Sequence, residues 1–132
     1  MAFDELGRVG ESQVFRVEPG IYLVRLGGRL TRAISDALTA LIARDDKGDR
    51  RSVLYEVSAA FSGYDPELRK LGNQSLLKSA AHIGIITNNS MLRMVAATVA
   101  LALRATTGTH MKTYDSVETA VADARVIISR PR

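Results

Sequence analysis

Apolar residues in this chain follow two periods, and their alternation predicts a mixture of strands and helices. Short apolar runs, often rich in β-branched residues, predict five strands, at 13–18, 21–26, 53–57, 82–87 and 110–114. Apolar residues at helical spacing predict four helices, at 31–44, 66–80, 90–104 and 116–125. Pro19-Gly20 separates the first two strands and predicts a hairpin, and Gly27-Gly28 is expected to end the second strand.

The order of these elements indicates one α/β domain over residues 1–132. Each of the last three strands follows a helix, so right-handed crossovers would make the sheet mostly parallel. The first strand arrives through a hairpin and is expected to lie antiparallel at the edge. The predicted fold is a mostly parallel five-stranded sheet with an antiparallel first strand and four helices. Residues 127–132 are expected to form a short extra strand or a loose tail.

Composition narrows the functional classes. The 132 residues include no cysteine, which removes disulfides, thiol catalysis and cysteine zinc sites and suits a reducing cytoplasm. Residues 1–10 do not read as a signal peptide, and the apolar stretch 94–103 is too short to span a bilayer, so a cytoplasmic protein without a membrane span is expected. The net charge is +4, but the basic residues are scattered and the few aromatic residues are not interleaved with them. No nucleic-acid partner is therefore expected.

No catalytic or metal motif stands out. Ser58 or Ser62, Asp65 and His82 form a hydrolytic triad on paper, yet neither serine lies in a Gly-x-Ser-x-Gly turn. His82 is expected to be structural or at the surface. The two histidines lack the acidic neighbours of a metal site, and Gly27-Gly28 lacks the spacing of a nucleotide-binding loop. We therefore expect no metal, no cofactor and no enzymatic activity.

Several strings resemble the STAS and SpoIIAA-like superfamily, the group of anti-sigma-factor antagonists and sulphate-transporter cytoplasmic domains. These strings are 21–31, which ends in Gly-Gly-Arg-Leu-Thr, together with 53–58, 83–87 and 110–120. The resemblance covers most of the chain. It implies a SpoIIAA-like domain with four helices and a largely parallel sheet. It also implies a regulatory or scaffolding protein that works by docking to other proteins.

The antagonist branch of this superfamily carries a serine at a helix start that a partner kinase phosphorylates. The corresponding strings here are Glu56-Val57-Ser58 and Tyr64-Asp65-Pro66, which place Pro66 at the phosphoacceptor position, and proline cannot accept phosphate. Ser58, Ser62 and Tyr64 remain as hydroxyls near the expected helix start, where phosphate would be favoured. Alternatively, the serines satisfy loop backbone groups. We expect 58–65 to be an exposed recognition loop, with Asp65 capping the next helix.

The helix expected at 90–104 has more apolar residues than one sheet-facing stripe requires. Met91, Met94 and Leu101 belong to the surplus, which must be covered by a neighbouring helix, a ligand or another chain. Methionine suits an adaptable contact surface. A helix buried inside the domain and a docking face fit this pattern equally well. For the docking face we predict partner binding, with a homodimer or a regulatory complex as the assembly. The competing prediction is a small apolar-ligand or lipid-binding domain of the Sec14 type.

Overall fold

Six strands form one sheet in the computed structural model, which describes residues 3–45, 50–64, 80–90, 93–94 and 109–129. The strands lie side by side in chain order: β1 (Asp4–Val9), β2 (Ser12–Glu18), β3 (Ile21–Leu30), β4 (Arg51–Tyr64), β5 (Ala80–Ile86) and β6 (His110–Tyr114). Neighbours are antiparallel from β1 to β3 and parallel from β3 to β6. The predicted hairpin and the mostly parallel sheet are thus confirmed.

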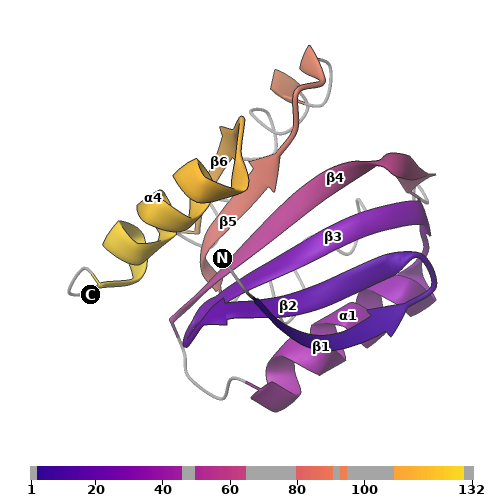
Figure 1. The fold of residues 1–132 in the computed structure, drawn as a ribbon, viewed down its shortest axis with the longest axis horizontal. Coiled ribbons are helices and arrows are strands. Elements are labelled where there is room, and N and C mark those ends of the chain that lie inside the picture. The colour runs from indigo at the N-terminus through magenta and orange to yellow at the C-terminus, as the bar shows by residue number, and fades with distance from the viewer. Residues whose placement is uncertain (1–2, 46–49, 65–79, 91–92, 95–108, 130–132) are drawn as a thin grey trace.

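Two helices cover opposite faces of this sheet, α1 (Arg32–Asp45) and α4 (Val117–Ser129) (Figure 1). Tyr22 and Val24 of β3 belong to the core on the α1 side, whereas Ile21 and Leu23 belong to the core on the α4 side. All four side chains are at most 1% exposed. The continuous apolar run of β3 follows from this position, because a strand covered on both faces does not need to alternate.

The prediction of five strands is wrong, because β1 forms an additional strand at the edge. Its pairing with β2 moves β2 into the sheet, so the first predicted strand is antiparallel but is not the outermost. β1 carries three charged residues among six, which hides the apolar alternation on which a strand prediction depends.

Two predicted strand ends are also wrong. β3 continues through Gly27-Gly28 to Leu30, and β4 continues through 58–64. Leu26 pairs with Val57 and Gly28 with Phe61, so β4 bulges by two residues between these pairs. Gly28 has a φ of 66°, which glycine adopts without strain. The two glycines therefore lie within the strand and do not end it.

Two of the four predicted helices lie within the described residues. α1 agrees with the prediction, and α4 starts as predicted but runs on to Ser129, so 127–129 are neither a strand nor a loose tail. The helix expected at 66–80 lies outside the described residues except for Ala80, which begins β5. Of the helix expected at 90–104, only Ser90, Arg93 and Met94 are described, and all three are helical. None of the described helices is long and apolar enough to cross a membrane.

Candidate functional site

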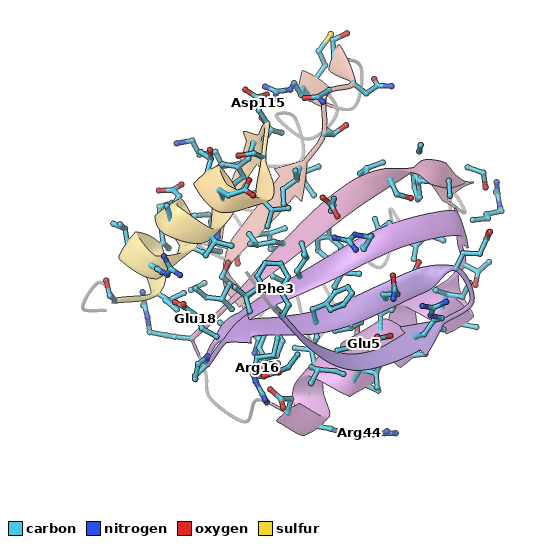
Figure 2. All side chains as sticks on the ribbon, in the orientation of Figure 1. Phe3, Glu5, Arg16, Glu18, Arg44 and Asp115 are labelled. Carbon is cyan, nitrogen blue, oxygen red and sulfur yellow. The ribbon has the colours of Figure 1, made fainter. Side chains whose placement is uncertain are left out.

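A hollow of about 510 Å³ lies where β6 meets α4. It is lined by Arg93, Lys112, Thr113, Tyr114, Asp115, Thr119, Ala122, Asp123 and Val126. Residues three and four apart share a helix face, which explains why 119, 122, 123 and 126 reach the hollow together. Asp115 stands at the turn between β6 and α4 (Figure 2). The lining therefore combines two cations with two carboxylates.

A chain of hydrogen bonds runs beneath the hollow and joins β4, β5, β6 and α4. Ser52 Oγ lies 2.7 Å from His82 Nδ1, and His82 Nε2 lies 2.7 Å from the Tyr114 hydroxyl. That hydroxyl donates to Asp123 Oδ2 at 2.5 Å. Ser52 and His82 are fully buried, whereas the Asp123 side chain is 30% exposed. We call these four residues the polar chain.

The protons of the polar chain have one consistent direction. Burial lowers the pKa of His82 to about 4, so its imidazole is neutral at neutral pH. Burial and the hydrogen bond to Asp123 raise the pKa of Tyr114, so this hydroxyl keeps its proton and donates it to the carboxylate. The Tyr114 oxygen then accepts from His82 Nε2–H, and His82 Nδ1 accepts from Ser52. All donors in the chain point toward Asp123, which is its only charged member.

Ion pairs hold the rim of the hollow. Arg93 pairs with Asp115, and Arg93 Nε also donates to the carbonyl of Thr87 at 3.2 Å. Lys112 Nζ lies 3.8 Å from Asp123 Oδ2, but the lysine side chain is 66% exposed. An exposed pair at that distance contributes little to stability, so Lys112 is free to reorient toward a bound molecule.

Two large apolar side chains are exposed, one in the lining of the hollow and one next to a lining residue in the sequence. Met94 is 73% exposed and Val126 is 50% exposed, and they are the large apolar residues with the greatest exposure in the described part of the chain. Val126 lines the hollow, and Met94 follows Arg93, which also lines it. Met94 therefore is not a core residue in this structure.

The predicted recognition loop 58–65 is a strand as far as Tyr64, and that part of the prediction is wrong. Ser58 Oγ donates to the carbonyl of Leu26 at 2.6 Å and accepts from the N–H of Ala60 at 3.2 Å. Ser58 therefore holds the bulge of β4 together. Ser62 is exposed, as predicted.

The remaining predicted site residues divide between the described and undescribed parts of the chain. Tyr64 ends β4, and Asp65, Met91 and Leu101 lie outside the described residues. His82, expected to be structural or at the surface, is fully buried and bridges two hydroxyls. Its serine partner is Ser52, so the triad with Ser58 or Ser62 does not form. No group of three potential metal ligands gathers within the described residues.

Sequence reasoning missed Ser52, Tyr114 and Asp123. Ser52 and His82 are register partners on β4 and β5, but they are 30 positions apart in the chain. A usable signal existed, because each of the two is a polar residue that directly precedes the apolar run of its strand. Two polar side chains at the same level of adjacent buried strands are expected to bond to each other.

No family model and no curated protein sequence matches this chain. Among solved structures, it is similar to an uncharacterised protein of the DUF3478 family from Shewanella loihica PV-4, which is described as having a SpoIIAA-like fold. The two share 15% sequence identity over 93% of this chain and 92% of that chain, with a TM-score of 0.62. Identity at this level carries information on the fold alone. The chain therefore has a SpoIIAA-like fold, as its local strings predict.

Proposed function

We propose that this chain is a non-enzymatic docking domain that binds a protein partner through the surface around the hollow. This surface, the α4–β6 surface, consists of Met94, Lys112, Asp115 and Val126. The observation that carries the proposal is the exposure of Met94 and Val126, at 73% and 50%, beside charges of both signs. Apolar anchors within a polar rim are typical of protein interfaces. The fitting partner is a segment with apolar side chains between acidic and basic residues.

The polar chain supports this proposal because it makes the floor of the hollow rigid. Asp123 is held by Tyr114, which is held in turn by His82 and Ser52 on the two neighbouring strands. A surface that is fixed before binding loses less conformational entropy when a partner binds. The floor is thus preorganised, while the side chains of Lys112 and Met94 remain exposed.

The same residues favour docking over catalysis. Ser52 and His82 resemble the serine and histidine of a hydrolase, but Ser52 is fully buried and offers no hydroxyl to a substrate. His82 has both ring nitrogens engaged, and its lowered pKa of about 4 makes it a poor base at neutral pH. The side chains of Ser52, His82 and Tyr114 all bond to other members of the polar chain, which is a structural task.

The proposal can be tested with Val126→Lys and the matched control Ala43→Lys. Both positions are exposed and lie near the C-terminal ends of helices on opposite faces of the sheet, where an added lysine is favourable to the helix. The wild-type protein and both variants would be used to capture partners from the cells of origin. A specific partner should bind the wild type and Ala43→Lys, and should be lost with Val126→Lys.

The captured protein would then be purified and its affinity for the three proteins measured. Burying a lysine against an apolar contact should weaken binding about tenfold or more. Equal affinity for Val126→Lys and the wild type would refute the α4–β6 surface as the docking site.

A further inference from the structure

Among the described strands, β1 forms an open edge of the sheet. It is the outermost strand in the sheet order, and no other described strand pairs with its outer side. Figure 1 shows β1, in indigo, at one end of the sheet and β6 at the opposite end. The backbone N–H and C=O groups along such an edge are able to pair with another strand.

A bulge in β1 places two opposite charges on the same face. Glu5 pairs with Phe15, and Arg8 pairs with Gln13, with a register shift between Glu5 and Gly7. Phe15 and Gln13 are two residues apart in β2 and so point to the same face, which brings Glu5 and Arg8 to one face as well. In a regular strand, residues three apart point to opposite faces. The extra residue at the bulge removes that difference.

Both charges are available for an external partner. Glu5 and Arg8 are exposed. Glu5 receives one long hydrogen bond from Gln13, at 3.4 Å, and Arg8 makes no hydrogen bond or ion pair with the residues that the structure describes. Figure 2 labels Glu5 on this outer strand. Charged residues usually discourage edge pairing, yet an acid and a base on one face of the same strand complement a reversed copy of that strand.

We propose that β1 pairs antiparallel with β1 of a second copy of this chain. The two-fold axis passes between Leu6 and Gly7, so that Glu5 of each copy faces Arg8 of the other. Such an interface is isologous, since each copy supplies the same acid and the same base. The two sheets become continuous through the dimer, and the α4–β6 surface at the far end of each sheet stays open. The inference thus goes beyond the proposed docking function and does not depend on it.

Charge reversal tests this pairing with a built-in rescue. Sedimentation equilibrium would be measured for the wild type, Glu5→Arg, Arg8→Glu and the double variant that carries both changes. In a dimer of either single variant, both contacts between positions 5 and 8 join like charges. This repulsion should weaken dimerisation about tenfold or more. The double variant restores both pairs and should dimerise like the wild type. Circular dichroism would verify that all four proteins are folded.

Three results of this sedimentation series would overturn the proposal. They are a wild type that stays monomeric at millimolar concentration, single variants that dimerise as well as the wild type, and a double variant as weak as the single ones. Loss of the dimer in Val126→Lys alone would move the interface to the α4–β6 surface and would equally refute pairing through β1. Partner capture should survive in Glu5→Arg and Arg8→Glu, so failure of one proposal is distinguishable from failure of the other.

Discussion

Among single residues, Tyr114 stands out because its hydroxyl serves two partners, the buried His82 and the partly exposed Asp123. It accepts from His82 Nε2 and donates to Asp123. Tyr114→Phe leaves the buried N–H of His82 without an acceptor, which should lower the free energy of unfolding by about 1–3 kcal/mol. Urea denaturation of the variant would measure this loss.

Tyr55→Phe is the matched control for this substitution. Tyr55 packs against the core on the α1 side, and its hydroxyl makes no hydrogen bond with the described residues. Removing that hydroxyl should change the free energy of unfolding by less than about 0.5 kcal/mol. Equal losses in the two variants would mean that the polar chain contributes no more than an ordinary tyrosine hydroxyl.

His82 should also make stability depend on pH. Burial lowers its pKa to about 4, with a partial offset from Asp123, whereas histidine in the unfolded chain titrates near its ordinary 6.5. Below pH 6.5 the unfolded chain therefore takes up a proton that the folded chain refuses. The contribution of the neutral, buried His82 to the free energy of unfolding is fully present above about pH 6.5 and is lost as the pH falls toward 4.

Between pH 7 and pH 5 this difference should cost the wild type about 2 kcal/mol of unfolding free energy. Glutamine does not titrate, so the unfolding free energy of His82→Gln should fall by about 2 kcal/mol less than that of the wild type between pH 7 and pH 5. Denaturation of both proteins at the two pH values would measure the difference. Equal losses of unfolding free energy in the two proteins between pH 7 and pH 5 would show that His82 is not the titrating group.

At the scale of elements, the bulge of β4 separates two serines that sequence reasoning treated alike. Ser58 bonds to both Leu26 and Ala60, whereas Ser62 is exposed and has no hydrogen bond among the described residues. Ser58→Ala should lower the free energy of unfolding by about 1 kcal/mol, and Ser62→Ala should leave it nearly unchanged. Thermal unfolding of the two variants would measure both changes in stability. A greater loss in Ser62→Ala would contradict the assignment.

The elements differ in how far the sequence predicts them. β3 and α4 are recognisable because their apolar residues are buried, and burial imposes a clear pattern. β1 is not recognisable, because an edge strand exposes Asp4, Glu5 and Arg8 and a bulge interrupts its period. The end of β4 contains serine and glycine, which read as a loop, although pairing with β3 keeps it extended.

The candidate site was less predictable than the fold, because it depends on which strands are neighbours and on their register. Periodicity reports which residues are buried, but it does not report which strands are neighbours or in what register. The contact between Ser52 and His82 depends on that register, and Tyr114 joins them only because β6 lies beside β5. The exposure of Met94 likewise depends on what surrounds its helix, so the pattern left core and interface equally open.

At the scale of the whole molecule, the sequential strand order should produce a gradient of stability across the sheet. β3 has a strand on each side and helices on both faces, and residues 21–24 are at most 1% exposed. β1 lies at the edge and is covered mainly on one side. Amide hydrogens of β3 should therefore exchange only through global unfolding, and those of β1 through local fraying.

Hydrogen exchange followed by NMR would test this gradient and the proposed dimer together. In dilute protein, we expect β1 amides to exchange at least about a hundredfold faster than those of β3, because fraying costs far less than unfolding. At higher concentration, pairing through β1 should slow the outward-facing amides near Glu5 and Arg8 and leave β6 unchanged. Protection that rises with concentration at β6 instead of β1 would place the contact between copies at the opposite end of the sheet. If the β1 amides of the dilute monomer were as well protected from exchange as those of β3, the predicted gradient of stability would be wrong.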